Sequence, residues 1–166
     1  VVVIKAKHHL GAGIARSFGR IGITVYGIGP SRWAPGLNSK YYKEKMVWDT
    51  YNKDSKETVR HLLRVGKKIG EKSVLLHTTD EIALIISEYA DELEKYFIFN
   101  RIQPQLVHSL INKREMHSLA TDHGIPIVKT YYPESRQEVE NYAGKCRFPV
   151  LLKGINSYVT LLQTGK

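Results

Sequence analysis

Short apolar segments alternate with helical segments over residues 1–99, and this alternation restricts the fold more than any other feature of the chain. The segments with the length and composition of strands are residues 1–4, 23–28, 45–48, 73–76 and 96–99. Between them lie helical patterns, and the pattern over residues 82–93 places its apolar side chains on one face. Strand–helix alternation predicts a Rossmann-like parallel sheet with helices on its faces and right-handed crossovers.

Local signals predict where the helices begin and end. The glycine pair at residues 11–13 follows the first strand and is expected to turn the chain into a helix over residues 14–21. Asp54 and Glu57 have the capping-box spacing, which indicates the start of a helix that reaches about residue 68.

A boundary is expected at Gln103–Pro104, between a Rossmann-like domain over residues 1–102 and a second domain over residues 103–166. Asn112 and Glu115 have cap spacing at a helix start, as do Ser135 and Glu138. The expected helices cover residues 105–111, 113–123 and 135–144, and the expected strands cover residues 127–131, 148–153 and 158–162. This pattern indicates the beginning of a small α+β domain, not a complete one.

The chain is basic, because 25 Lys and Arg residues face 16 Asp and Glu residues and give a formal net charge of +9. Such a surplus is compatible with nucleic-acid or polyphosphate partners. The chain has no long Lys/Arg run, Arg-Gly repeat, zinc-ligand spacing or RNP-type aromatic motif. We therefore expect most of this charge to be a solvated surface and do not expect nucleic acid as a partner.

The single cysteine, Cys146, excludes an internal disulfide and a Cys-rich metal site, which fits a reducing cytoplasm. No apolar run is long enough to span a bilayer, so no membrane partner is expected. The chain begins directly in a strand without Met and stops at Lys166 just after another strand-like run. We therefore expect a fragment of a longer protein.

The first strand is followed by a loop that resembles a dinucleotide-binding loop, at residues 11–16. Arg16 replaces the third glycine of that fingerprint, and Gly29 and Pro30 stand where a ribose-binding acid is expected. A tight glycine turn is therefore the preferred interpretation. His8 and His9 lie at the same sheet edge, and we expect loop histidines there, with substrate contact as the alternative.

The end of the fourth strand carries a second group of polar residues. Thr78 or Thr79 is expected to cap the following helix, and Asp80 and Glu81 suit the electrostatics of its first turn. A catalytic carboxylate pair is the alternative reading of these two acids.

Two lysines are the strongest candidates for a binding site. Lys113 opens a helix, where the helix dipole disfavours a cation, and Arg114 follows it. Lys153 is expected at the end of a buried strand, where its charge must reach a cleft or an anion. Solvation at the surface would satisfy either lysine alone. One anion bound by both would satisfy the pair, and the best candidate is a nucleotide polyphosphate.

With these residues, the chain resembles the amino-terminal part of an ATP-grasp enzyme. Residues 11–27 are similar to the opening of the pre-ATP-grasp domain, and residues 78–81 fit the same domain. More specific matches follow in the family's order: residues 112–115, then 124–126, then 148–153. The resemblance is nearest to D-aspartate ligase-like proteins and to the carbamoyl-phosphate synthase large subunit, both carboxylate-amine ligases of this superfamily.

The resemblance implies that Lys113 and Lys153 hold the phosphates of ATP. It also implies a carboxylate that attacks the γ-phosphate to give an acylphosphate, and an amine or ammonia that displaces phosphate from it. The substrates would be small molecules, the protein cytoplasmic, and a homodimer is allowed.

The chain departs from the family in what it lacks. The acidic and amide ligands of Mg²⁺ would lie in sequence beyond Lys166, and the phosphate-covering loop at residues 155–158 is short and has no added glycine. The chain alone is therefore expected to be inactive. Two alternatives stay open: an NAD(P)-binding Rossmann oxidoreductase and a basic nucleic-acid-binding module.

Overall fold

The computed structural model of the chain describes residues 1–50 and 53–156. The chain divides into two compact units, Val1–Val107 and His108–Lys166. Within the described ranges, none of the helices combines the length and the apolar character that crossing a membrane requires.

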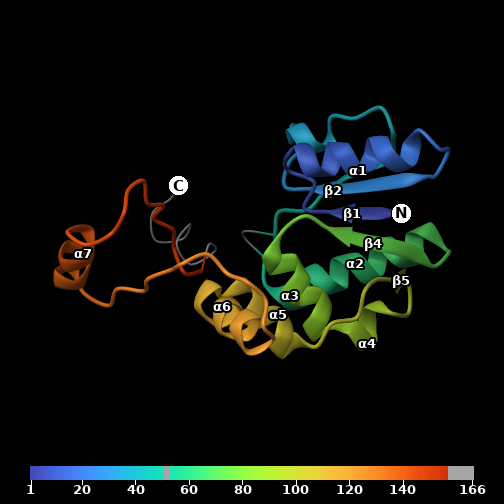
Figure 1. Cartoon of the computed structure of the whole chain (residues 1–166). Helices are drawn as coiled ribbons and strands as arrows, with labels where there is room; N and C mark the ends of the chain where they lie inside the picture. The colour runs from blue at the N-terminus through green and yellow to red at the C-terminus, as the bar shows by residue number, and fades with distance from the viewer. Residues whose placement is uncertain (51–52, 157–166) are drawn as a thin grey trace. The chain divides into compact units, whose positions relative to one another are not determined.

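The first unit is built on a five-stranded parallel sheet (Figure 1). Its strands are β1 (Val2–Ile4), β2 (Val25–Gly29), β3 (Tyr42–Val47), β4 (Ser73–His77) and β5 (Phe97–Ile98). They lie in the order β3-β2-β1-β4-β5, and each neighbouring pair is parallel. The order changes direction at β1, so the loops after β1 and its neighbours line the edge where open parallel sheets bind ligands. The predicted parallel sheet of about five strands is confirmed.

Helices cover both faces of this sheet (Figure 1). α1 (His9–Gly19) and the short 3-10 helix η1 (Pro35–Leu37) lie on one face, and α2 (Ser55–Ile69), α3 (Asp80–Glu88) and α4 (Ala90–Leu93) lie on the other. In β1, Val2 and Ile4 pack in the core on the α2 side, whereas Val3 packs in the core on the α1 side. All three are fully buried, which explains why β1 is continuously apolar.

α2 begins and ends as its sequence predicts. The Asp54 Oδ1 atom accepts a hydrogen bond from the Glu57 amide at 2.6 Å, which satisfies an amide of the first turn. Gly70 follows the helix in the left-handed conformation, at φ 81°, which glycine adopts without a Cβ clash. The apolar residues Val59 and Leu62 are buried in the core, as the helical spacing predicts.

α1 begins earlier than predicted, so the glycine pair lies inside the helix and not in a turn before it. The helix starts at His9 after the N-cap residue His8. Gly11 packs against the loop after β1, where an added Cβ atom would lie 2.7 Å from the Ala6 Cβ atom. The buried Tyr42 hydroxyl donates a hydrogen bond to the Gly11 carbonyl at 2.7 Å, and burial raises the pKa of Tyr42 to about 12. The predicted glycine turn is therefore wrong, and Gly11 permits close packing instead.

The residue after β1 is a lysine whose charge is paired inside the protein. Lys5 is 2% exposed, and its Nζ atom lies 2.5 Å from the Glu81 Oε1 atom. Its carbonyl accepts a hydrogen bond from the Thr78 hydroxyl at 2.6 Å. Its φ of 61° lies in the left-handed region, which residues other than glycine rarely occupy. The first residue of the loop after β1 is thus held by α3 through its side chain and by the loop after β4 through its backbone.

The helices of the second unit follow the sequence signals. α5 (Pro104–Ile111) spans the division between the units, and α6 (Lys113–Asp122) and α7 (Arg136–Ala143) follow it. α7 begins at its predicted cap, since the Ser135 Oγ atom accepts a hydrogen bond from the Glu138 amide at 3.2 Å. α6 ends before Gly124, which has φ 67°.

The strands predicted for the second unit are not formed in its described part. Residues 127–131 and 148–153 have irregular backbone, and neither segment pairs with a strand among the residues described. An unpaired segment has no ladder to satisfy its backbone hydrogen bonds, so its apolar pattern alone does not make it a strand. The third predicted strand, residues 158–162, lies outside the described residues.

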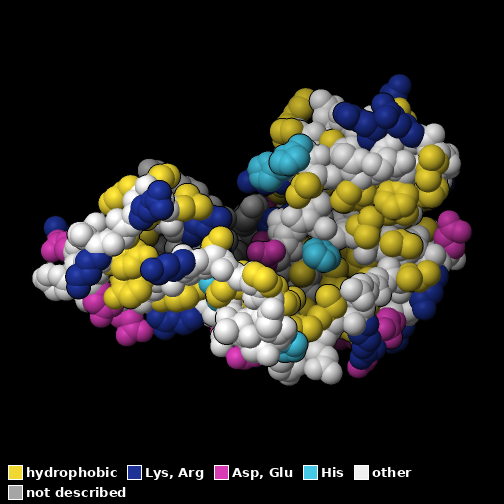
Figure 2. Space-filling view, viewed as in Figure 1, with side chains coloured by type: hydrophobic (Ala, Val, Ile, Leu, Met, Phe, Trp, Pro, Cys, Tyr) yellow, Lys and Arg dark blue, Asp and Glu magenta, His cyan; other side chains and the backbone are white. Residues whose placement is uncertain are grey.

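The apolar side chains of these two segments are exposed. Val128, Phe148, Leu151 and Leu152 are 77%, 65%, 78% and 89% exposed. On the face shown in Figure 2, hydrophobic side chains alternate with lysines and arginines over this unit. The sequence pattern therefore marks residues suited to burial, although the described chain leaves them in solvent.

Trp48 and His61 stack between the end of β3 and α2. Their ring centroids lie 4.2 Å apart with an interplanar angle of 8°, and the Trp48 Nε1 atom donates a hydrogen bond to the Thr58 Oγ1 atom at 3.2 Å. Burial lowers the pKa of His61 to about 4, and the neighbouring Arg64 charge acts in the same direction. The folded protein therefore keeps this imidazole neutral.

The first prediction concerns the pH dependence of stability. The unfolded chain protonates His61 near pH 6.5 and the folded protein only near pH 4, so stability falls as the pH falls through this window. We expect a loss of about 2 kcal/mol between pH 7 and pH 4.5, discounted for partial exposure of the ring. Urea denaturation followed by tryptophan fluorescence should show this loss in the wild type and in His8→Phe, but much less of it in His61→Phe. The same pH dependence in all three proteins would contradict the prediction.

The second prediction concerns the Lys5–Glu81 pair. Lys5→Met leaves the Glu81 carboxylate without its buried partner, so we expect a loss of about 2 kcal/mol in the free energy of unfolding. Lys53→Met breaks the exposed Lys53–Glu57 pair, which has a separation of 3.5 Å, and should cost less than about 0.5 kcal/mol. Denaturation at pH 7 measures both.

The double variant Lys5→Met/Glu81→Leu serves as the control for that prediction. It removes both charges, so it should be more stable than Lys5→Met alone. If the double variant loses as much stability as Lys5→Met and Glu81→Leu lose together when measured singly, the two side chains do not interact.

Candidate nucleotide-binding site

The start of α6 is fixed by its cap residue. The Asn112 Oδ1 atom accepts hydrogen bonds from the amides of Arg114 at 3.0 Å and Glu115 at 3.3 Å. The Asn112 Nδ2 atom donates a hydrogen bond to the Glu115 Oε1 atom at 2.9 Å. The predicted cap is therefore confirmed, and it places Lys113 at the first position of the helix.

Lys113 contacts the segment that carries Lys153. The Lys113 amide donates a hydrogen bond to the Ile155 carbonyl at 3.1 Å, and the Lys113 Nζ atom lies 3.4 Å from the same oxygen. Ile155 follows Lys153 closely in the chain, and all three residues belong to the second unit. The structure thus brings the segments of the two predicted lysines together, although the lysines are 40 residues apart in the sequence.

Lys153 does not lie at the end of a strand, contrary to the prediction. Its backbone is irregular and its side chain is exposed, like those of the neighbours Leu151 and Leu152. The expected problem of a cation leaving a buried strand therefore does not arise in the described structure. Lys153 remains a candidate because an exposed lysine close to Ile155 can supply a mobile charge to an anion near Lys113.

Arg114 has partners within the protein. Its Nη2 atom lies 3.1 Å from the Glu134 Oε1 atom, and its guanidinium lies 5.2 Å from the ring centroid of Tyr132. The carboxylate offsets the cost of a cation at the helix start. The dipole argument therefore requires no bound anion for Arg114, and the candidate site depends on the two lysines.

The first amides of α6 already have acceptors. The amide of Lys113 donates to the Ile155 carbonyl, and the amides of Arg114 and Glu115 donate to the Asn112 side chain. A helix start binds phosphate through amides that lack such acceptors. A polyphosphate here would therefore be bound by lysine side chains, and the residues present fit such a role through their charge.

Tyr132 and His117 belong to the same cluster, and sequence reasoning missed both. The Tyr132 hydroxyl lies 3.0 Å from the Lys113 carbonyl oxygen and 2.7 Å from the His117 Nδ1 atom. Tyr132 directly follows the segment predicted as a strand, and His117 lies in the middle of α6, away from its cap. The i,i+4 spacing of Lys113 and His117 on one helix is a signal that could have linked these two residues, whereas no local pattern links Tyr132 to Lys113.

The carboxyl edge of the sheet is organised differently from the prediction. Thr78 donates its hydroxyl hydrogen bond to the Lys5 carbonyl and does not cap α3, whose N-cap residue Thr79 makes no side-chain capping bond. Glu81 is paired with Lys5, so it is not available as one of two catalytic carboxylates. Lys5 was missed, although a lysine directly after a buried apolar strand is a signal that sequence reasoning could have used.

His8 and His9 are exposed, as expected of loop histidines, although both lie at the start of α1. Over the part of the chain that the structure describes, no group of three or more His, Cys, Asp or Glu side chains is placed to bind a metal ion. No residue described here is therefore assigned to Mg²⁺.

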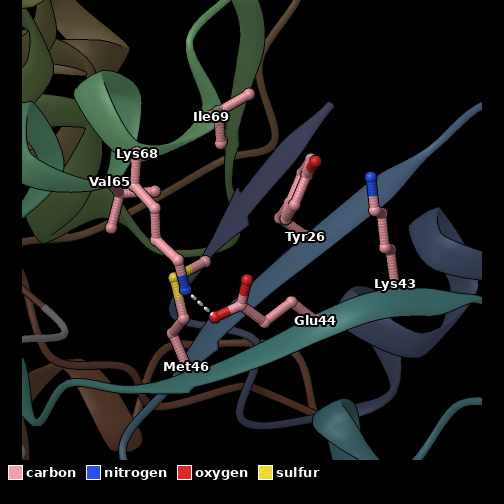
Figure 3. A pocket seen from close by; sticks show the side chains of 7 residues that line it. All are labelled: Tyr26, Lys43, Glu44, Met46, Val65, Lys68 and Ile69. Carbon is pink, nitrogen blue, oxygen red and sulfur yellow. Dashed lines mark hydrogen bonds and ion pairs between the residues drawn. The ribbon is translucent and has the colours of Figure 1, made fainter.

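A shallow hollow lies between β2, β3 and the end of α2 (Figure 3). Its lining residues are Tyr26, Lys43, Glu44, Met46, Val65, Lys68 and Ile69. Lys68 points from α2 towards Glu44 and forms an ion pair with it, and the Lys43 Nζ atom lies 5.7 Å from the Tyr26 ring centroid. Tyr26 pairs with Glu44 near the amino ends of the strands, so this hollow is at the opposite edge from the loops that follow the strands.

No protein-family profile matches the chain. The chain is 28% identical over 153 residues to a D-aspartate ligase from Enterococcus faecium (strain Aus0004), which aligns with 87% of this chain and 36% of the ligase. It therefore spans about a third of the length of that relative.

Solved structures show the same fold. An L-amino acid ligase from Bacillus licheniformis matches with a TM-score of 0.60 at 12% identity, over 87% of this chain and 41% of its own. The biotin carboxylase domain of the Hydrogenobacter thermophilus 2-oxoglutarate carboxylase, solved with MgADP, ADP and bicarbonate, matches with a TM-score of 0.58 at 16% identity, over 93% of this chain and 34% of its own. The chain is similar to the ATP-grasp superfamily, as its motifs predict. The similarity to the D-aspartate ligase is one of sequence, and the similarity to these two structures is one of fold.

Proposed function

We propose that this chain is part of an ATP-dependent ligase that joins a carboxylate to an amine or ammonia through an acylphosphate. The similarity to a D-aspartate ligase supports the general class, and the shared fold is consistent with it. Because the chain spans about a third of that relative, the remaining two-thirds would carry the rest of the active site. Residues 1–102 would form the pre-ATP-grasp domain and residues 103–166 the beginning of the ATP-grasp domain.

The contact between Lys113 and Ile155 is the observation that carries this proposal. It draws the segment of Lys153 to the start of α6, where the amide and the Nζ atom of Lys113 both meet one carbonyl oxygen. Two lysines at such a junction can share the charge of a polyphosphate that neither could neutralise alone. Surface solvation explains each lysine alone, but it gives no reason for their segments to meet.

The chemistry assigned to the lysines is charge neutralisation. The substrate carboxylate would attack the γ-phosphorus of ATP, ADP would leave, and the amine would then displace phosphate from the acylphosphate. Lys113 and Lys153 would stabilise the negative charge of the phosphates and hold them in position, which is the main protein contribution in phosphoryl transfer. Mg²⁺ would also stabilise the negative charge of the phosphates, and its ligands would lie in sequence beyond Lys166.

An NAD(P)-binding oxidoreductase has less support. The glycines that resemble a dinucleotide fingerprint lie inside α1, and Gly11 is in contact with Ala6 and Tyr42. Gly11 therefore faces protein atoms where a cofactor pyrophosphate would need access to the backbone.

The third prediction tests the two lysines. ATP titrated into the chain should bind weakly, in about the millimolar range, because only part of a site is present. Lys113→Met and Lys153→Met should each weaken binding by about fivefold to tenfold, the loss of one charged contact. Lys129→Met, which removes another exposed lysine of the second unit, is the matched control and should leave the affinity unchanged. Equal affinities for all four proteins would remove the phosphate role of the lysines.

The fourth prediction concerns turnover. Incubated with ATP, Mg²⁺, amino acids and ammonia, the chain alone should release no ADP above the rate of spontaneous hydrolysis, because the expected metal ligands lie outside it. A coupled assay for ADP measures this directly. Substrate-dependent release of ADP by these 166 residues would show that the proposed division of the active site is wrong.

A further inference from the structure

We propose that Tyr132 is a positioning residue that holds Lys113 for the polyphosphate, an inference that rests on the function proposed above. The Tyr132 hydroxyl donates a hydrogen bond to the Lys113 carbonyl at 3.0 Å and lies 2.7 Å from the His117 Nδ1 atom. All three residues belong to the second unit and are partly buried. The contact joins the segment before α7 to the first turn of α6.

The backbone of Lys113 is held on both sides. Its amide donates to the Ile155 carbonyl at 3.1 Å, and its carbonyl accepts from Tyr132. A helical carbonyl already faces the amide four residues later, so the bond from Tyr132 is additional to those the helix needs. Fixing both peptide groups reduces the freedom that the lysine must lose when it binds an anion, which is how a positioning residue raises affinity.

The hydrogen bonds determine where the protons lie. A tyrosine hydroxyl has one proton, so it can donate to the Lys113 carbonyl or to the His117 ring, but not fully to both. Both short contacts are satisfied when the His117 Nδ1 atom carries a proton and donates it to the hydroxyl oxygen. The structure therefore predicts that neutral His117 has its proton on Nδ1, whereas the imidazole of a free histidine favours Nε2.

Tyr132→Phe isolates this hydrogen bond. The phenyl ring retains the surface on which the Arg114 guanidinium packs, at 5.2 Å from the ring centroid, and leaves the Arg114–Glu134 ion pair in place. Tyr131→Phe is the matched control, because Tyr131 stacks on Tyr142 at 4.4 Å and its hydroxyl donates a hydrogen bond to the Glu138 Oε2 atom at 3.4 Å. Both variants remove one hydroxyl from adjacent residues.

The first arm of the experiment determines which ring nitrogen of His117 carries the proton, and it needs no ligand. Nitrogen-15 NMR of the histidine rings at about pH 8 should show His117 mainly with the proton on Nδ1 in the wild type and in Tyr131→Phe. In Tyr132→Phe the ring should shift towards the Nε2 form. An unchanged His117 signal in Tyr132→Phe would overturn the inference, whatever the chain binds.

The second arm reads affinity for ATP. Tyr132→Phe should weaken binding by about threefold to tenfold, the range of a single neutral hydrogen bond, and Tyr131→Phe should not. If Tyr132 acts through Lys113, adding Tyr132→Phe to Lys113→Met should cause no further loss. Independent, multiplicative losses in the double variant would overturn the positioning role.

The outcomes separate this inference from the proposed function. If the wild type binds ATP and Tyr132→Phe binds it equally well, the role of Tyr132 is overturned. The ligase proposal is not affected by that result. No ATP binding by any of the proteins overturns both the polyphosphate site and the role of Tyr132 in it, and the NMR arm then reports only the structural contact.

Discussion

β1 is buried on both faces of the sheet, and the arrangement of the first unit follows from that burial. Its three residues are fully buried, with α1 on one side and α2 and α3 on the other. Such a strand can only occupy the middle of a sheet, where both faces are covered. The next residue is Lys5, which cannot reach solvent and is paired with Glu81 instead. The central position of β1 therefore also determines how the loops after β1 and β4 are joined.

Lys5, Arg114 and Lys113 have three different structural environments. Lys5 is enclosed and paired with an acid from α3, and Arg114 is held by Glu134 and the ring of Tyr132. Lys113 instead has its backbone fixed by Ile155 and Tyr132. The Lys113 Nζ atom also lies 3.4 Å from the Ile155 carbonyl oxygen, so the backbone and the side chain of this lysine meet the same segment.

The elements that the sequence predicts well are those determined by neighbouring residues. The caps at Asp54, Asn112 and Ser135 form as predicted, since each depends on atoms within three residues. The central strands also form, because their apolar runs have partners in the same unit. The start of α1 was misjudged because glycines were interpreted as a turn, although close packing against Ala6 explains Gly11.

What the sequence could not predict depends on residues far apart in the chain. Residues 148–153 have a strand-like pattern of side chains. A strand also needs a second strand to pair with, and the side-chain pattern does not indicate whether one is present. The same holds for the candidate site. Lys113 was predicted as a candidate because a helix start is a local feature, whereas Tyr132 and Ile155 reach it only through the path of the chain in space.

The packing of Gly11 affects how sequences of this kind should be interpreted. A glycine-rich stretch after a first strand is commonly taken as evidence of a nucleotide cofactor, yet here its glycine acts as a spacer between a helix and the loop beneath it. Motif searches that score the glycines without the loop geometry would therefore assign such chains to the wrong class of cofactor-dependent enzymes. The size of the residue at position 6 offers a simple discriminator, because a spacer glycine is needed only where a side chain opposes it.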